Sequence, residues 1–330
     1  MKNFFTLILL RLLLNATALF AQQDPQFSHY MNNKLFMNPA YAGMRRALCM
    51  SAIYRNQWNG FEGAPNSGVF SADLALPDER GGVGFNLMYD KLGFENNLNF
   101  NGNYSKHFEL KNQAKLGIGI EVGGFSKRLG PSGNQQWLAT TNWQADASIP
   151  PQIKKTVLDF GLGIWYQDPK LWFGISSSHL NGKLIDDGSE TVNYQNQSTT
   201  HHLIFQMARH YFITGGVNLF QTNIWEIKPS FLIKTDGTIT TVDLNVTVVY
   251  KNRFWFGASY RYKDAICPMA GFLIPISSFN PDLGLKVGFA YDYTTSHLKN
   301  YNNGTFEIFL NYCIPVEWIK GWHRDTRIFL

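Results

Sequence analysis

Residues 282–294 read DLGLKVGFAYDYT and change character from one position to the next. The odd-numbered positions, from Leu283 to Tyr293, are all apolar, whereas the even-numbered ones are glycine, alanine or polar. Successive side chains of a β-strand point to opposite faces of its sheet. The stretch therefore predicts a strand with one face suited to hydrocarbon and the other suited to water.

The same alternation returns elsewhere, for example in residues 158–167, 242–251 and 305–314. A soluble β-sandwich could bury such apolar faces in a core, and this alternative stays open. A membrane is favoured because the polar faces are rich in Asn, Asp, Lys and Glu, and each unpaired buried polar group costs about 1 to 3 kcal/mol. Polar side chains that line a wet or loosely plugged lumen do not incur that cost, because water can hydrogen-bond to them. Several apolar stripes also end in tyrosine, where the aromatic girdle of a membrane barrel would lie; these residues are Tyr89, Tyr104, Tyr166, Tyr250, Tyr262, Tyr291 and Tyr293.

Composition agrees with this interpretation. Charged residues make up 16% of the 330 positions, below the roughly 25% of soluble domains. After the N-terminus, no apolar run approaches the roughly 18 to 20 residues of a membrane-spanning helix, so residence in a membrane would require a barrel. The net charge of +5 is spread thinly. Without a basic cluster it does not indicate nucleic-acid binding.

The first 21 residues have the layout of a secretory signal peptide. Lys2 precedes a leucine-rich run over residues 7–14, and small residues follow at Ala16, Ala18 and Ala21. Cleavage after Ala18 or after Ala21 is expected, the latter giving a mature start at Gln22. Arg11 inside the apolar run is atypical. We exclude residues 1–21 from the fold.

The alternating segments number about fourteen, an even number as in bacterial single-chain barrels. We expect strands near residues 47–58, 66–76, 82–92, 95–108, 114–127, 156–167, 170–179, 201–213, 224–235, 239–251, 253–263, 267–276, 282–295 and 304–315. Short turns follow the even-numbered strands, and long connections follow odd-numbered ones, near 128–155, 180–200 and 296–303. Outer-membrane barrels have short periplasmic turns and long external loops. The pattern thus predicts an all-β outer-membrane barrel of antiparallel strands over 47–315, with both termini in the periplasm and a periplasmic tail over 316–330.

Two short stretches near the mature start point to a family. Residues 23–30 read QDPQFSHY and residues 37–43 read MNPAYAG. Together with YRNQW at 54–58, Gly60, Ala64, Pro65, GVG at 82–84 and the region of Tyr89, they resemble the PorP/SprF-type outer-membrane proteins of the type IX secretion and gliding-motility machinery. The Asn66-Ser67-Gly68 stretch departs from the pattern, where a Lys-Thr-like pair is expected. The resemblance implies binding to a secreted surface protein, and to periplasmic ring or lipoprotein components of that machinery.

Residues 22–46 form a segment too apolar for a free linker, while Pro25 and Pro39 oppose one continuous helix. We expect it to enter the lumen or the periplasmic mouth of the barrel. It could be a plug that only stabilises the barrel, or it could dock a periplasmic partner. Long external loops carrying Trp137 and Trp143 offer aromatic anchors for a second partner, or are simply mobile surface loops. The candidate partner-binding residues are Asp24, Pro25, Gln26, Phe27, Tyr30, Asn38, Pro39, Tyr41, Arg55, Gln57, Trp58, Trp137 and Trp143.

Motifs for catalysis, cofactors or metals are not expected. The eight histidines are dispersed, and the adjacent His201 and His202 would face opposite sides of a strand. Carboxylates at Asp243, Asp282, Asp292 and Glu307 are interpreted as ordinary polar lining of a lumen. The glycines at 117, 119, 123 and 124 favour strand curvature over a phosphate cradle.

The three cysteines, Cys49, Cys267 and Cys313, each fall in or beside an expected strand. Export places them in an oxidising compartment, where a disulfide plus one free thiol is possible. The interpretation as three small buried or lumenal residues is preferred.

The sequence thus predicts a non-enzymatic outer-membrane component that binds outer-membrane lipid and proteins, without cofactor or nucleic acid. A passive pore for small solutes is the alternative, since a barrel of this size has room for one if nothing blocks it. An open porin usually has no apolar N-terminal segment, so residues 22–46 discriminate between the two.

Overall fold

The computed structural model describes residues 24–77, 80–130, 153–182, 184–194, 197–222, 224–276 and 283–316. The predicted signal peptide, the predicted tail beyond Val316, and Trp137 and Trp143 lie outside these ranges.

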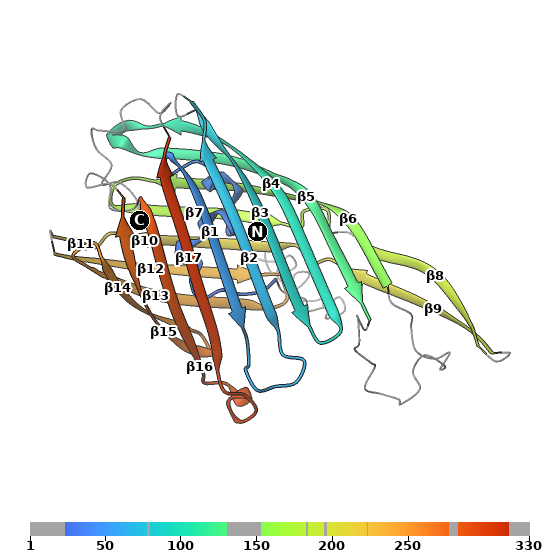
Figure 1. Ribbon diagram of the computed structural model, residues 1–330. Helices are drawn as coiled ribbons and strands as arrows, with labels where there is room; N and C mark the ends of the chain where they lie inside the picture. The colour runs from blue at the N-terminus through green and yellow to red at the C-terminus, as the bar shows by residue number, and fades with distance from the viewer. Residues whose placement is uncertain are drawn as a thin grey trace, which may run out of the picture.

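Fourteen antiparallel strands close into a barrel, as predicted (Figure 1). Each strand pairs with its neighbours, β1 pairs with β17, and β10 pairs with β12 to complete the circle. The wall strands are β1 (Ala47–Asn56), β2 (Asn66–Ala75), β3 (Gly81–Leu92), β4 (Glu95–Glu109), β5 (Lys115–Leu129), β6 (Ile153–Gln167), β7 (Leu171–Ser178), β10 (His210–Val217), β12 (Trp225–Thr235), β13 (Thr240–Tyr250), β14 (Phe254–Arg261), β15 (Ala265–Pro275), β16 (Gly284–Thr294) and β17 (Thr305–Pro315). A two-residue strand, β11 (Phe220–Gln221), also pairs with β12.

One predicted strand, 201–213, is wrong. Its residues belong to two elements, β9 (Gln197–Gln206) and β10. β9 pairs with β8 (Leu184–Tyr194), which occupies the predicted loop 180–200, and this hairpin extends beyond the barrel wall (Figure 1). The first six residues of β9, QSTTHH, lack the apolar stripe that a membrane-facing strand needs.

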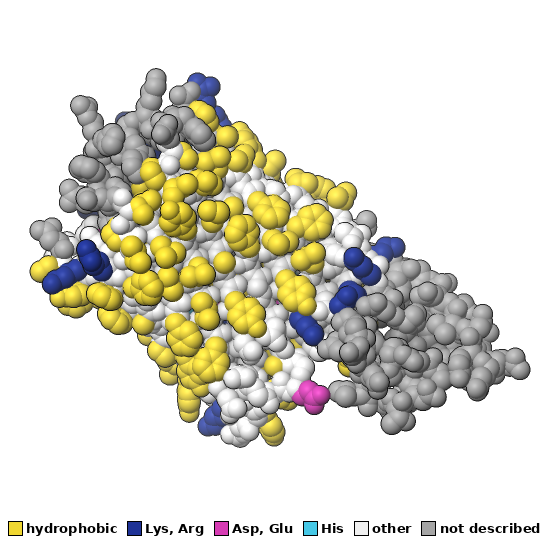
Figure 2. Space-filling view, viewed as in Figure 1, with side chains coloured by type: hydrophobic (Ala, Val, Ile, Leu, Met, Phe, Trp, Pro, Cys, Tyr) yellow, Lys and Arg dark blue, Asp and Glu magenta, His cyan; other side chains and the backbone are white. Residues whose placement is uncertain are grey.

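Side chains face the two sides of the wall as the alternation predicts. Val246 and Phe289 are each 48% exposed on the outer surface, where hydrophobic side chains form a broad band (Figure 2). Asn245 and Lys286 are buried on the inner side. Leu283 is an exception, because it is buried next to the ends of β1 and β17. No helix among the described residues combines the length and apolar character needed to cross a membrane.

Residues 24–46 fill the lumen and are called the plug below. They contain two 3₁₀ turns, η1 (Tyr30–Asn32) and η2 (Pro39–Tyr41), and one short helix, α2 (Lys34–Met37). Further single turns, η4 (Lys111–Gln113) and η6 (His297–Asn300), lie in wall connections. The plug runs from the end of the barrel where β7 finishes, here the loop end, to the end where β1 begins and β17 finishes, here the terminal end. Its apolar side chains Phe27, Tyr30, Leu35, Met37 and Tyr41 are buried, so the lumen is packed.

Glycines in the wall let the plug backbone approach it. A Cβ atom on Gly119 of β5 would lie 2.3 Å from the Ala40 nitrogen, and one on Gly82 of β3 would lie 2.2 Å from the Ala42 oxygen. A side chain at either position would clash with the backbone of the plug. The glycine at position 119, predicted to curve the strand, therefore also makes room for the plug.

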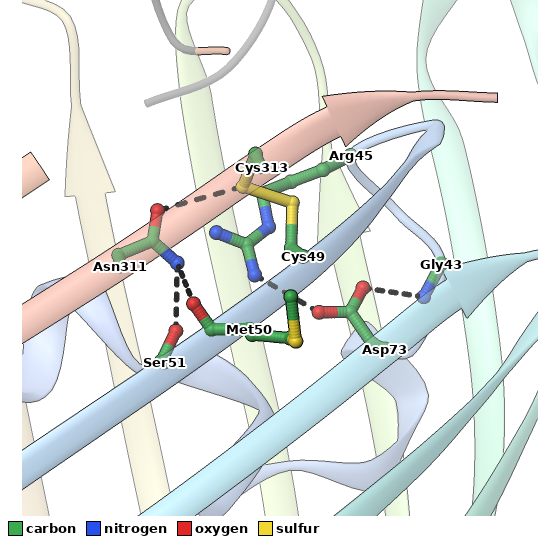
Figure 3. Close-up of a disulfide and its surroundings, with 8 residues drawn as sticks. All are labelled: Gly43, Arg45, Cys49, Met50, Ser51, Asp73, Asn311 and Cys313. Carbon is green, nitrogen blue, oxygen red and sulfur yellow. Dashed lines mark hydrogen bonds and ion pairs between the residues drawn. A yellow bond between two sulfur atoms is a disulfide. The ribbon is translucent and has the colours of Figure 1, made fainter. Parts of the chain in front are cut away.

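The preferred interpretation of the cysteines is wrong for two of the three. Cys49 of β1 and Cys313 of β17 form a disulfide (Figure 3), and Cys267 is a buried free thiol. The two bonded residues are direct cross-strand partners in the register that closes the barrel. They are 264 positions apart in the chain, so their pairing appears only after closure.

Candidate functional site

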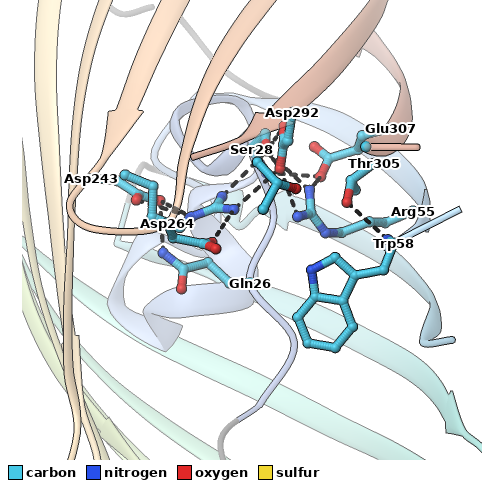
Figure 4. Close-up of polar contacts among 12 residues, drawn as sticks. Gln26, Ser28, Arg55, Trp58, Asp243, Asp264, Asp292, Thr305 and Glu307 are labelled. Atoms are coloured by element: carbon cyan, nitrogen blue, oxygen red, sulfur yellow. Dashed lines mark hydrogen bonds and ion pairs between the residues drawn. The ribbon is translucent and has the colours of Figure 1, made fainter. Parts of the chain in front are cut away.

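Two buried arginines of the wall form the centre of an ion-pair network in the lumen (Figure 4). Arg55 of β1 donates from Nη2 to Asp292 Oδ2 at 2.6 Å and from Nη1 to Glu307 Oε2 at 3.0 Å. Arg261 of β14 donates from Nε to Asp243 Oδ1 at 3.1 Å and from Nη1 to Asp292 Oδ2 at 3.1 Å. Two positive and three negative side chains are thus paired inside the barrel, and His29 Nδ1 of the plug lies 2.7 Å from Glu307 Oε1.

The plug enters this network through its backbone and short side chains. The Ser28 and His29 amides donate to the two oxygens of Glu307 at 2.8 and 2.7 Å. Ser28 Oγ donates to Asp292 Oδ1 at 2.7 Å, and Gln26 Nε2 donates to Asp243 Oδ2 at 2.7 Å. These carboxylates, predicted to be ordinary polar lining, therefore hold the plug. Asp282 lies outside the described residues.

A second polar cluster joins the first residues of the plug to the wall at the loop end. His179 follows β7 and His210 begins β10. His179 Nε2 lies 3.2 Å from both carboxylate oxygens of Asp24, and its Nδ1 lies 2.7 Å from Asp159 Oδ2. Lys234 Nζ donates to the Asp24 main-chain oxygen at 2.6 Å.

Electrostatics in this cluster favour the charged forms of two groups. Burial alone would raise the pKa of Asp24, but His210, His179 and Lys234 outweigh it and hold that pKa well below its usual range. Burial alone would lower the pKa of His179, but the charge of Asp24 and hydrogen bonds to Asp159 and Asp24 outweigh it and hold that pKa well above its usual range. The plug is thus tied to the wall at this end by an ion pair.

A cavity of about 60 Å³ opens between the plug and the wall at the terminal end. Its described lining includes four basic residues, Lys34, Arg45, Lys228 and Lys286, and no acidic one. Two of these four residues are ion-paired, Arg45 with Asp73 at 2.9 Å and Lys228 with Glu226 at 2.6 Å. Lys34 Nζ lies 4.1 Å from the ring centroid of Trp172. The charged side chains in the described lining of this cavity are thus all basic, and it is called the positive cavity below.

Most of the predicted partner-binding residues turn out to contact the barrel's own interior. Phe27 packs on Ile53, Val69, Met88 and Phe309; Tyr30 packs on Met37, Phe212 and Leu232; and Tyr41 meets the Trp165 ring edge-on at 4.9 Å. Asn38 donates to the Ile164 and Ile175 carbonyls, Pro39 is buried in η2, and Pro25 lines cavities beside Asp24 and Phe27.

Two predicted residues lie outside this arrangement. Gln57 and Trp58 are half-buried at the loop end, where the Trp58 amide donates to Thr305 Oγ1 at 3.1 Å. Arg55, in contrast, belongs to the central network. Sequence reasoning gave Asp243, Asp292 and Glu307 only as polar lining of the lumen. It gave no role in holding the plug to Ser28, His29, His179, His210, Lys234 or Arg261, although Ser28 and His29 lie inside the motif QDPQFSHY.

Solved structures share this fold at low sequence identity. The chain matches a structure titled CymD monoaromatic hydrocarbon channel with 12% identity and a TM-score of 0.51, covering 86% of this chain and 93% of that one. It matches the Ralstonia pickettii toluene transporter TbuX with 11% identity and a TM-score of 0.49, over 85% and 92% of the two chains. It matches the P. putida toluene transporter TodX with 9% identity and a TM-score of 0.48, over 86% and 94%. At 12% identity the likeness to the CymD channel shows a shared β-barrel fold alone.

Among curated proteins, none matches the sequence. The sequence profile of the type IX secretion system membrane proteins PorP/SprF matches residues 19–312, nearly the whole chain. This match confirms the resemblance carried by QDPQFSHY, MNPAYAG and YRNQW. The chain is a member of the PorP/SprF family of type IX secretion system membrane proteins.

Proposed function

We propose that this barrel is a non-enzymatic component of type IX protein secretion and gliding, which binds a secreted surface protein and helps to export or anchor it. Family membership supports the assignment to the machinery. The observation that carries the protein-binding role is the packed plug, because Phe27, Tyr30 and Tyr41 are each less than 10% exposed. A barrel whose lumen is filled in this way offers its surfaces and loops to other proteins instead of an open path to solutes.

The passive-pore alternative is less well supported by the geometry. The cavity at the terminal end measures about 60 Å³, and those lined by Asp24 and by Phe27 measure about 20 Å³ each. Spaces of this size hold one or a few water molecules. Solute passage would require the plug to move, and the buried hydrogen bonds from Ser28 and His29 to Glu307 and from Ser28 to Asp292 oppose that movement.

The proposed orientation places both termini in the periplasm, so that the terminal end faces the periplasmic ring or lipoprotein components. There the plug contributes Asn32, Lys34, Tyr41 and Arg45 to the lining of the positive cavity. Phe27 and Tyr30 are buried, so docking would use this edge of the plug instead. We propose that a periplasmic partner places acidic side chains against it.

At the loop end, the connections face the cell exterior in this orientation. Trp137 and Trp143 belong to the connection between β5 and β6 and are proposed to contact the secreted protein, as aromatic anchors often do. The β8–β9 hairpin extends from the same end (Figure 1).

The experiment compares one charge reversal at each end of the barrel. Lys228→Glu at the positive cavity should reduce surface display of the secreted protein and its cross-linking to periplasmic components, while heat-modifiable barrel remains in the outer membrane. Lys263→Glu is the control, since Lys263 is exposed in the turn between β14 and β15, at the other end from the positive cavity and outside the β5–β6 connection. Full display and unchanged cross-linking in a folded Lys228→Glu variant would contradict docking at the terminal end.

A further inference from the structure

We propose that Asp24, His179 and His210 form a binding site for one divalent transition-metal ion, of which Zn²⁺ is the best match. The three residues come from the plug, from the position that follows β7 and from the start of β10. Their potential ligand atoms all lie within 4.8 Å of one another. Nothing in the spacing of these residues along the chain indicates such a site.

Two of the three donor pairs are at distances close to those of a tetrahedral site, and the two histidine nitrogens lie within 4.8 Å of each other. Both Asp24 oxygens lie 3.2 Å from His179 Nε2, and Asp24 Oδ2 lies 3.7 Å from His210 Nδ1. Zinc–nitrogen and zinc–oxygen bonds of about 2.0 to 2.1 Å put neighbouring donors of a tetrahedron roughly 3.3 Å apart. A shift of the His210 side chain toward His179 would therefore admit the ion, which replaces the proton between His179 and Asp24.

The orientation of His179 is set by a carboxylate behind it. Its Nδ1 donates to Asp159 Oδ2 at 2.7 Å, and Asp159 is fully buried. This contact fixes the ring so that Nε2 points to Asp24. A carboxylate–histidine pair of this kind typically supports a histidine that ligates a metal.

His210 provides an independent observation that points to a ligand. The residue is 2% exposed, and within the described structure its Nδ1 has no hydrogen-bond partner. Its Nε2 instead accepts the Asp24 amide proton at 3.1 Å. Coordination through Nδ1 moves the ring proton to Nε2, so the Asp24 amide contact has to open. That rearrangement limits the affinity without blocking the site.

The space at the cluster and its donor atoms also suit a transition-metal ion. A cavity of about 20 Å³ touches all three residues, which leaves room for one water molecule as a fourth ligand. Two imidazoles and one carboxylate suit Zn²⁺, Cu²⁺ or Ni²⁺, whereas Ca²⁺ and Mg²⁺ prefer oxygen ligands. The Lys234 ammonium is the opposing charge, but it donates to the Asp24 main-chain oxygen. The carboxylate of Asp24 thus stays available, and a bound ion would fasten the start of the plug to the wall.

The test measures binding of Zn²⁺ to the untagged, metal-free mature protein in detergent, by equilibrium dialysis. We expect one equivalent per chain. His210→Gln and Asp24→Asn should weaken binding by more than about tenfold, and Asp159→Asn by about ten- to a hundredfold, as for other residues that support a ligand. His107→Gln is the matched control, because His107 is a buried histidine that contacts the Ala42 oxygen at the terminal end.

A second measurement does not depend on whether the variants fold. Co²⁺ added to the wild-type protein should give the visible absorption of a four-coordinate nitrogen and oxygen site, and one equivalent of Zn²⁺ should abolish it. Binding well below one equivalent, or stoichiometric binding that His210→Gln leaves unchanged, would overturn the proposal. The same holds if the cluster variants lower stability but wild type takes up no metal, since the cluster would then be an ion-pair lock only.

Discussion

Cys49 on the first strand and Cys313 on the last strand are direct cross-strand partners, and a disulfide joins them across the seam at which the barrel closes. The bond lies at the terminal end, near Ala47 and the buried Leu283 (Figure 3). It spans 264 positions, so it turns the wall into a covalent ring.

We predict that removing this ring closure lowers the stability of the barrel. In the chain-entropy account a loop of this length is worth up to about 5 kcal/mol, because the crosslink restricts the unfolded chain. Cys49→Ser should lower the temperature at which the heat-modifiable band converts on a gel, and reductant should do the same to wild type. Cys267→Ser should leave that temperature almost unchanged, and an equal fall in both variants would argue against a role for the disulfide.

Arg55→Met should destabilise both the barrel and its plug. The change removes the partner of Asp292 and Glu307 and leaves buried carboxylates poorly compensated, at a cost of about 3 to 5 kcal/mol. Chemical unfolding would measure this loss, and limited proteolysis would show earlier cleavage within residues 24–46. Tyr54→Phe, at the exposed neighbouring position, is the control. Wild-type protease resistance in Arg55→Met would show that the network does not hold the plug.

Gly119→Ala should displace the plug and open a conducting path. The added methyl group would overlap the Ala40 backbone, and overpacking of this kind costs about 1 to 3 kcal/mol. Single-channel recording in planar bilayers should show larger or more frequent openings than wild type. Gly102→Ala on the adjacent strand is a matched control, since its Cβ meets no atom closer than 3.7 Å. Identical recordings from the two variants would refute the glycine argument.

Val246→Arg should interfere with insertion into the membrane. Val246 is 48% exposed on the outer face near the middle of β13, and arginine on the lipid side near the midplane costs about 2 to 4 kcal/mol. Folding titrations into lipid vesicles should show this loss, with Val246→Leu close to wild type. Tolerance of the arginine would mean that this face does not meet lipid.

The orientation of the barrel is tested by labelling from outside the cell. In a Cys267→Ser background, a cysteine replacing Lys299 at the loop end should react with a membrane-impermeant maleimide on intact cells. A cysteine replacing Lys111, in the turn between β4 and β5 at the terminal end, should react only after the outer membrane is opened. The reverse pattern would place the termini outside.

The wall of the barrel was predictable because its signal is local. Alternation within residues 282–294 reports which side chains share a face, and that property needs no contact with the rest of the chain. The number of strands, and the face on which each side chain lies, were predicted from the same alternation in the other segments. The prediction failed at 201–213, where the residues up to Gln206 pair with β8 outside the wall even though Leu203, Ile204 and Phe205 are apolar. The family motif could also be identified from the sequence, whereas the path of its residues through the lumen could not be predicted.

Contacts between distant residues depend instead on how the closed circle sets its register and on what fills it. Cys49 meets Cys313 only because β1 pairs with β17 in one alignment, and Ser28 reaches Glu307 across 279 positions only because the plug lies inside that circle. A glycine such as Gly119 is indistinguishable in sequence from one that merely bends a strand. His179 and His210 show the same limit, since neither is near Asp24 in the chain and the lumen alone brings the three together.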